Sequence, residues 1–336
     1  MLSGEIKEYF LTIFLSLITI FDLISYVLYI LLIIFLIKKL YKKENETLSG
    51  FHTLIVFNAI LDILFITEEY ISYRIPQFGI FSNFYQNIFS NILISGICYI
   101  YSLCHVNFIF LSGITITFNR YYAIKYPMKY KYFWRGWKLL ILMIWPSFIV
   151  IPFFIKYYSV SVQYVKDYTG RQSVIVLDSN SNNAIWQFTS CIHCISLAIN
   201  GILTIFLIRL LKINLKDTTF QNKSFKVDLL MTKYAIIYFL LFGFVVIVEI
   251  PMTIASNLEY FEIANDLLTL TVLCQSSVVF FPLYGLFILS KEIRVNFFEF
   301  IDSTKVFNFI IPKFCVVEQN RALRRNTILQ SHKAIK

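Results

Sequence analysis

The chain has little charge and few residues that interrupt helices. Only 15% of its residues are charged, whereas soluble domains average about 25%, and the 336 residues include only 10 Gly and 7 Pro. No Gly/Ser-rich or Pro-rich stretch marks a linker to a second domain. Apolar residues make up 58% of the chain, and the mean hydropathy is +0.68. These values exclude a soluble protein and predict an integral membrane protein.

Seven apolar runs are long enough to cross a bilayer. A hydrocarbon core of about 30 Å requires about 20 apolar helical residues, because no water there can satisfy the backbone. We therefore predict an all-α membrane protein, a seven-transmembrane helix bundle. Its predicted spans are residues 14–37, 51–73, 92–124, 139–158, 184–211, 234–255 and 267–290.

The distribution of Lys and Arg predicts the orientation. With the N-terminus outside, 25 of the 30 Lys and Arg residues fall on the cytoplasmic side. This asymmetry is the positive-inside pattern, so residues 1–13 are expected to be extracellular and residues 291–336 a cytoplasmic tail. The net charge of +10 is then a matter of topology, and no nucleic-acid partner is expected. The five outside are Lys7, Arg74, Lys156, Lys166 and Arg171.

The first eight residues lack the basic leader and the small-residue cleavage site of a signal peptide. We therefore expect the first run to remain in the chain as a signal anchor. Residues 14–290 then form one membrane domain.

Cysteine and histidine offer no convincing metal site. Cys191, His193 and Cys194 are three neighbours, whereas structural zinc requires four converging ligands, so no metal and no cofactor are expected. Cys98 lies near the outer end of the third span, and Cys191 and Cys194 lie near that of the fifth. An outer disulfide and buried free thiols therefore both remain open.

Residues 117–130 (TFNRYYAIKYPMKY), at the inner end of the third span, carry the sharpest local pattern. Arg120 and Tyr121 are followed by apolar residues and then by Pro127. This arrangement resembles the inner end of the third helix of G-protein-coupled receptors, with Asn119 in place of the usual acidic residue.

The rest of the pattern is similar to nematode serpentine chemoreceptors of the gamma superfamily, class gamma or class V. The similar features are the Phe-Asn-Arg start, Tyr130 to Trp134, Asn58 to Asp62, Trp145-Pro146, and Pro282 followed by residues 290–294 (SKEIR). The resemblance covers about residues 10–300, and the order of the motifs matters more than any single one.

The resemblance implies a multi-pass receptor of the plasma membrane, including the ciliary membrane of sensory neurons. Such a receptor would bind a small-molecule odorant or pheromone and activate a heterotrimeric G protein, and membrane lipid and a receptor dimer are further partners. No catalytic motif indicates an enzyme. A seven-span ligand-gated channel and a transporter stay as alternatives. The outside N-terminus argues against an insect-type channel, and no inverted repeat indicates a transporter.

The resemblance also assigns roles at the inner end. Arg120, with Asn119, Tyr121 and Pro127, would contact the G protein. From its charge alone, Arg120 at the end of a long helix can either snorkel to lipid phosphate or point into the bundle.

Three acids lie within the predicted spans, where a charge costs about 3 kcal/mol or more. Asp62 is near the midplane of the second span, one helical turn after Asn58. By resemblance it matches the acid that holds water or sodium in receptors, and a hydrogen-bonded structural Asp is the alternative. The other two acids are Asp22 and Glu249.

Glu249 lies two residues before Pro251, in the outer third of the sixth span. Small-molecule pockets open between helices at this depth. We predict a ligand site there, formed by Glu249, His105 and Asp22 together with Tyr101. Mutual pairing of these buried groups without any ligand is the alternative.

The predicted sixth and seventh spans each contain a proline. Pro251 and Pro282 are the expected pivots of a helix rearrangement. Residues 291–301 place apolar side chains four residues apart and predict an amphipathic helix on the inner leaflet. Cys315 is a candidate for palmitoylation, with a plain cytosolic thiol as the alternative.

Overall fold

The computed structural model describes residues 2–41, 49–166, 170–216, 223–258 and 260–303. Seven of the described helical segments are long and apolar enough to span a membrane, which confirms the predicted bundle. The spans are Thr12–Tyr41, Gly50–Gln77, Leu93–Lys125, Trp137–Tyr157, Ser179–Ile213, Leu229–Asn257 and Asp266–Leu289.

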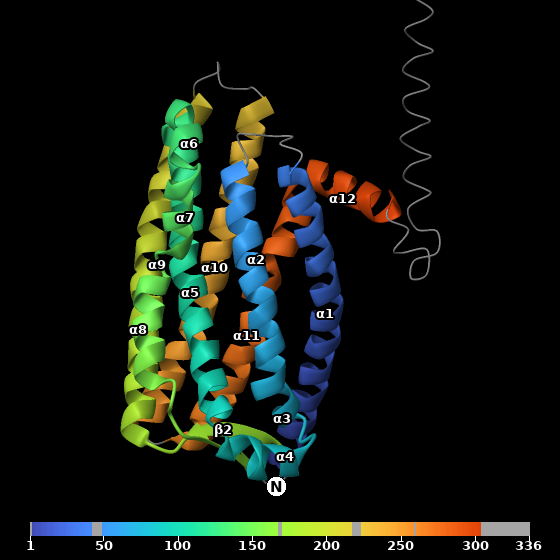
Figure 1. Cartoon of the computed structure of the whole chain (residues 1–336), viewed down its shortest axis with the longest axis vertical. Helices are drawn as coiled ribbons and strands as arrows, with labels where there is room; N and C mark the ends of the chain where they lie inside the picture. The colour runs from blue at the N-terminus through green and yellow to red at the C-terminus, as the bar shows by residue number, and fades with distance from the viewer. Residues whose placement is uncertain (1, 42–48, 167–169, 217–222, 259, 304–336) are drawn as a thin grey trace, which may run out of the picture. The chain divides into compact units, whose positions relative to one another are not determined.

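The spans are built from helices of different lengths (Figure 1). The first, third, fifth, sixth and seventh spans belong to α1 (Leu2–Tyr41), α5 (Leu93–Lys125), α9 (Ser179–Lys216), α10 (Lys223–Asn257) and α11 (Phe261–Leu289). The second span joins α2 (Ser49–Glu69), the π-helix η1 (Tyr70–Arg74) and α3 (Ile75–Gln77). The fourth joins α7 (Trp137–Ile144) and α8 (Ser147–Tyr157). The connections contain α4 (Ser82–Asn87), η2 (Phe89–Asn91) and α6 (Pro127–Phe133).

The third span lies at the centre of the bundle, because α5 packs against α2, α8, α9 and α10. The seventh span, in α11, packs against α10 and α1. Side chains of α5 are buried along most of its length, whereas the other spans leave apolar faces exposed, as helices that contact lipid do. The third span is therefore the most buried of the seven spans.

The fourth span is interrupted at Trp145 and Pro146, between α7 and α8. Pro146 has no backbone N–H to donate, so the regular helical ladder cannot continue through it. The indole of Trp145 donates a hydrogen bond of 2.7 Å to the Thr115 hydroxyl on the third span. The break thus coincides with a polar link between two spans.

The π-helix in the second span changes the position of Arg74. Its wider turn closes with a hydrogen bond from the N–H of Ile75 to the carbonyl of Tyr70, five residues back. Ser72, Tyr73 and Arg74 are buried, and Arg74 is 0% exposed. The expectation that Arg74 lies in an outer loop is therefore wrong, because the helix continues past Tyr73 and carries the side chain into the bundle.

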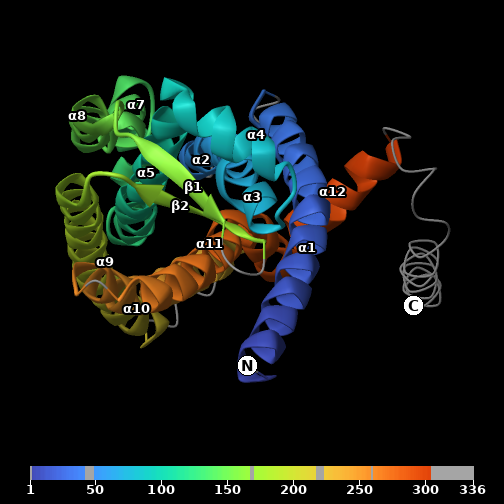
Figure 2. The ribbon, with the colours of Figure 1, turned by 90° about the horizontal axis from the view of Figure 1, so that it is seen from below.

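A two-stranded hairpin between the fourth and fifth spans was not expected from the sequence. Strands β1 (Val162–Lys166) and β2 (Gln172–Val176) pair antiparallel, with Val162 opposite Val176 and Lys166 opposite Gln172. Alternate side chains face the bundle, as the pleat of a strand requires. Figure 2 shows the hairpin across one end of the bundle, which we call the hairpin end. The opposite end, where Arg120 lies, is the Arg120 end.

Tyr164 fastens the hairpin to the bundle. Its hydroxyl donates a hydrogen bond of 2.9 Å to the carbonyl of Ser72, and its backbone N–H donates one of 3.2 Å to the Ser90 hydroxyl. Burial raises the pKa of the Tyr164 phenol well above its usual value, so the hydroxyl stays a donor at neutral pH. The hairpin is thus held through its buried face.

The chain divides after Leu289, and the described helix beyond this point is α12 (Lys291–Ser303). It agrees with the helix predicted at 291–301. Ile293, Phe297 and Ile301 follow one another at spacings of four and share one stripe of this helix. Cys315, the candidate lipidation site, lies outside the described residues.

Substitution of Gly96 by Ala should destabilise the hairpin end. A Cβ at Gly96 would overlap the carbonyl oxygen of Val160, a backbone atom in the connection to β1. We expect a loss of about 1–3 kcal/mol of stability, seen as a lower thermal midpoint of the detergent-solubilised protein. Gly201→Ala is the control, because its Cβ would meet the Phe239 ring at an ordinary 3.5 Å. Equal midpoints for the two variants would contradict this packing.

Candidate functional site

The half of the bundle nearer the hairpin end, which we call the hairpin half, contains a buried ionic cluster. This cluster, the Arg74 network, is formed by Asp22, Glu69, Tyr70, Arg74 and Ser276. The Arg74 guanidinium donates to Asp22, to Glu69 at 2.9 Å and to the Ser276 hydroxyl at 2.5 Å. The hydroxyls of Tyr70 and Ser276 each donate to the same Asp22 oxygen at 3.0 Å. The network therefore joins the first, second and seventh spans.

Burial makes this network costly to disturb. Arg74 is 0% exposed, and Asp22 and Glu69 are each 1% exposed. Removing ions from water costs several kcal/mol each, and the cost is recovered only where the charges remain paired and hydrogen-bonded. One guanidinium serving two carboxylates is thus a structural link between three spans.

A second buried pair lies deeper in the bundle. The Tyr29 hydroxyl donates to Asp62 at 2.9 Å, and the other Asp62 oxygen is 3.5 Å from His105 Nε2. The imidazole of His105 stacks on Phe65, with ring centroids 4.8 Å apart, and Tyr101 lies one turn away with its ring centroid 6.1 Å from that of His105. Asp62 is 4% exposed, so it faces the bundle as expected.

Asn58, one turn before Asp62, is also turned into the bundle. Its side-chain amide donates a hydrogen bond of 2.6 Å to the Ser112 hydroxyl on the third span. The second and third spans are therefore linked by polar contacts at successive turns.

The third pair joins the fifth and sixth spans. Glu249 hydrogen-bonds to Nδ1 of His193 and accepts a further hydrogen bond of 3.3 Å from the Ser190 hydroxyl. Glu249 is 2% exposed and His193 is 1% exposed. The ring of Phe110, on the third span, stacks on His193 with centroids 3.8 Å apart. Glu249 is thus held by two side chains of the fifth span, one of which packs against the third span.

The structure brings Tyr101 and His105 of the predicted ligand site together, but it places Asp22, His105 and Glu249 in separate contacts. Asp22 contacts Arg74, His105 contacts Asp62, and Glu249 contacts His193. The alternative of pairing among these groups themselves does not hold for Asp22, His105 and Glu249, because each of them pairs with a different neighbour. The ligand site itself stays a prediction.

A small cavity lies between two of these pairs. Its volume is about 10 Å³, about that of a single water molecule, and its lining includes Phe65, Phe110, Val245 and Gln275. Phe65 stacks on His105, and Phe110 stacks on His193. The Asp62 pair and the Glu249 pair are therefore separated by the cavity and by the apolar and aromatic side chains that line it.

At the other end, Arg120 is enclosed by an arrangement that we call the Arg120 cage, with Asn119, Tyr130 and Phe51. Arg120 donates to the Asn119 side chain and to the Tyr130 hydroxyl at 3.3 Å, and Asn119 also donates to that hydroxyl at 3.1 Å. The guanidinium carbon lies 4.0 Å from the centroid of the Phe51 ring. Arg120 is 3% exposed, so it points into the bundle and does not snorkel to lipid.

The neighbours of Arg120 in the motif are more accessible. Tyr121 is half-buried and accepts a hydrogen bond of 2.6 Å from Lys125, while Pro127 is exposed at the first position of α6. Pro282 is buried within α11, and Pro251 is exposed within α10. Among the residues predicted to contact the G protein with Arg120, Asn119 is thus the one for which a hydrogen bond to Arg120 is seen.

The sequence of the seven spans matches a known family of membrane proteins. A sequence model described as Srg family chemoreceptor matches residues 16–297, which include nearly all of the seven spans. The chain belongs to the Srg family of chemoreceptors. The match confirms the predicted resemblance to nematode serpentine chemoreceptors and places this Srg chemoreceptor among multi-pass membrane receptors. A search of curated proteins finds no match.

Several polar residues of this Srg chemoreceptor were missed from its sequence. From the sequence, Arg74 is expected outside the second span and three intramembrane acids are expected, whereas Glu68 and Glu69 also lie within the second span. Glu68 accepts a hydrogen bond of 2.7 Å from the Ser102 hydroxyl. The sequence indicates His193 only as a neighbour of two cysteines, and its pairing with Glu249 is not expected from it. The sequence signal for the buried pair is Glu69, followed five residues later by Arg74, at the end of an apolar run.

Replacement of Arg74 by Ala should strongly destabilise the Srg chemoreceptor. The change leaves Asp22 and Glu69 buried without their cation, which costs about 3–5 kcal/mol. We expect a lower thermal midpoint in detergent and a reduced fraction of protein at the cell surface. The control is Arg171→Ala, because that residue is only half-buried.

A triple variant separates the charge effect from the loss of packing. Arg74→Met together with Asp22→Asn and Glu69→Gln removes all three charges and should recover most of the lost stability. A triple variant no more stable than Arg74→Ala would contradict the view that uncompensated charge is the cause.

Proposed function

We propose that this Srg chemoreceptor binds a small-molecule odorant or pheromone in the hairpin half of the bundle and activates a heterotrimeric G protein at the Arg120 end. It would act in the plasma membrane, including the ciliary membrane of sensory neurons. The observation that carries the proposal is the Arg120 cage, a buried cation held by side chains of the second span, the third span and α6.

The ligand side of the proposal is supported by the polar pairs around the small cavity. The cavity is lined by Phe65, which stacks on His105, and by Phe110, which stacks on His193, the partner of Glu249. His105 and Glu249 both belong to the predicted ligand site. A cavity of about 10 Å³ is too small for an odorant, so binding requires the helices around it to separate. A ligand that binds the separated form better would shift the population towards it.

The sixth and seventh spans have the means for such a rearrangement. Pro251 lies inside α10 and Pro282 inside α11, and each removes one hydrogen bond from its helix. Pro251 follows Glu249 by two residues, so a change at Glu249 lies next to a point where the helix bends easily. We propose that Asp62 and Asn58 link the two halves through the second and third spans.

At the Arg120 end, activation would open the Arg120 cage. While the guanidinium is enclosed by Asn119, Tyr130 and Phe51, it is buried and cannot contact a partner. Release of Arg120, beside Tyr121 and Pro127, would present a cation and an aromatic surface to the G protein. Aromatic residues and Arg are the groups that contribute most to protein interfaces.

Replacement of Arg120 by Ala should abolish signalling and leave surface expression intact. The measurement is cAMP or calcium in cells that express the chain with promiscuous G proteins and receive pools of volatile and water-soluble odorants. Lys166→Ala, which removes an exposed cation from the hairpin, away from the Arg120 end, should respond like the wild type. A response that survives in Arg120→Ala would contradict G-protein coupling through Arg120, and an odorant-evoked current without G proteins would indicate a channel.

Replacement of Tyr130 by Phe should raise basal signalling. The change removes the hydroxyl that Arg120 and Asn119 share but keeps the ring against Trp134, 6.1 Å away between centroids. Loss of about 1 kcal/mol from the closed form increases the open population about fivefold. The measurement is basal cAMP normalised to surface expression.

The matched control is Tyr132→Phe, because Tyr132 lies on the same helix α6 and is 79% exposed. Its basal signal should equal that of the wild type. Equal basal signals from the two variants would contradict the role of the Arg120 cage as a restraint on activation.

A further inference from the structure

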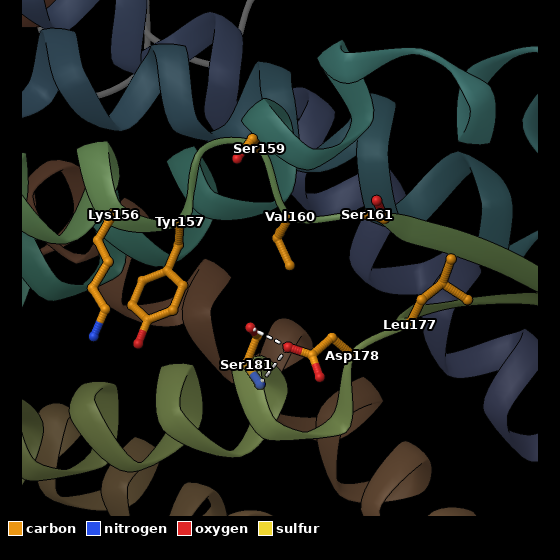
Figure 3. A pocket seen from close by; sticks show the side chains of 8 residues that line it. All are labelled: Lys156, Tyr157, Ser159, Val160, Ser161, Leu177, Asp178 and Ser181. Atoms are coloured by element: carbon orange, nitrogen blue, oxygen red, sulfur yellow. Dashed lines mark hydrogen bonds between the residues drawn. The ribbon is translucent and has the colours of Figure 1, made fainter.

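A cleft of about 630 Å³ lies outside the sites described above, between the ends of the fourth and fifth spans (Figure 3). It is formed by the last turn of α8, the connection to β1, the residues after β2 and the first turn of α9. Its volume is within the range of about 300–1,000 Å³ that is usual for small-molecule sites.

The cleft has one cation and one anion on opposite walls. Figure 3 shows Lys156 and Tyr157 on one side, Asp178 and Ser181 across from them, and the Val160 side chain between. Lys156 and Asp178 are both exposed, and among the described residues they form no ion pair with each other. The Lys156 ammonium lies 4.9 Å from the centroid of the Tyr157 ring.

Asp178 is held as an ionised carboxylate by the start of α9. It accepts hydrogen bonds from the backbone N–H groups of Asn180 and Ser181, at 3.3 and 3.1 Å, and from the Ser181 hydroxyl at 2.5 Å. These bonds lower the pKa of Asp178 below its usual value, so the charge persists at neutral pH. The cleft therefore presents permanent charges of both signs.

The position of the cleft matches the level of lipid headgroups. Lys156 is in the last turn of the fourth span and Ser181 in the first turn of the fifth, where the hydrocarbon core gives way to the polar interface. Ile155 and Leu177 are 63% and 60% exposed beside it, and Tyr158 is 42% exposed. Exposed apolar side chains beside Tyr and Lys are typical of the membrane interface.

Deeper in the membrane, the same two spans close against each other. The rings of Phe153 on α8 and Phe188 on α9 stack with centroids 4.5 Å apart. The two spans thus meet through aromatic rings farther along α8 and α9, and both helices carry exposed apolar side chains such as Ile151 and Ile195. A molecule that fits the cleft has a head with both charges and an apolar part that can follow these side chains.

We propose that the cleft binds the zwitterionic headgroup of a phospholipid from the leaflet on the hairpin side. The phosphate contacts Lys156, the ammonium contacts Asp178, and the acyl chains lie along α8 and α9. A bound lipid would then hold the ends of the fourth and fifth spans at a fixed separation.

Photo-crosslinking of the full chain in nanodiscs tests this site. The nanodiscs contain phosphatidylcholine with a small fraction of a photoactivatable phosphatidylcholine, and mass spectrometry locates the label. Wild-type protein should be labelled within residues 153–188. Lys156→Gln and Asp178→Asn should each lower this labelling about fivefold, which corresponds to about 1 kcal/mol. Asn at position 178 retains the helix cap, so a folding defect is not expected.

Two comparisons make the test specific. Lys166→Gln removes an exposed cation from the hairpin outside the cleft and should leave the labelling unchanged. With photoactivatable phosphatidylglycerol, which lacks the ammonium, wild-type labelling should be weaker, and Asp178→Asn should raise it. Unchanged labelling in Lys156→Gln, or equal labelling by the two lipids, would overturn the proposal.

Competition identifies the source of the headgroup. Excess free phosphocholine should displace little of the label, because it lacks the apolar part that lies against α8 and α9. Complete displacement would overturn the lipid as occupant and indicate a soluble zwitterion with the same head chemistry.

Discussion

The pairing of Arg74 with Asp22 and Glu69 is the interaction on which the hairpin half of the bundle depends. The three side chains belong to the first and second spans, and Ser276 adds the seventh. No water enters the hydrocarbon region to satisfy these charges, so their positions must be mutually consistent. The π-helix η1 satisfies this requirement, because its wider turn coincides with the segment that carries Arg74 into the bundle. The hairpin is then fastened to the same segment through Tyr164 and the carbonyl of Ser72.

The interior is organised as separate polar pairs within aromatic packing. Asp62 with His105 and Glu249 with His193 are each backed by a stacked ring, from Phe65 and Phe110 respectively. The rings exclude water and strengthen the pairs by lowering the local dielectric constant. Both rings also line the small cavity. A displacement of either pair would therefore alter the side-chain packing around the cavity.

The two ends of the Srg chemoreceptor differ in what holds them closed. At the hairpin end, ionic contacts and the backbone hydrogen bonds of a hairpin predominate. At the Arg120 end, the guanidinium of Arg120 contacts one amide, one phenol and one aromatic face. The two ends are therefore held by different kinds of side chain, carboxylates around Arg74 and neutral polar and aromatic groups in the Arg120 cage.

Length and hydropathy alone determined the seven spans and their order, because the need to cross about 30 Å of hydrocarbon acts on each segment separately. The motif around Arg120 and the burial of Asp62 could also be predicted, since both follow from position within a span. The partners of Asp22, His105 and Glu249 could not, because they depend on how each helix is rotated about its axis. Arg74 shows the reason most clearly. Its sequence position indicates a loop, and only the π-turn of the second span and the carboxylates of two spans make its burial favourable.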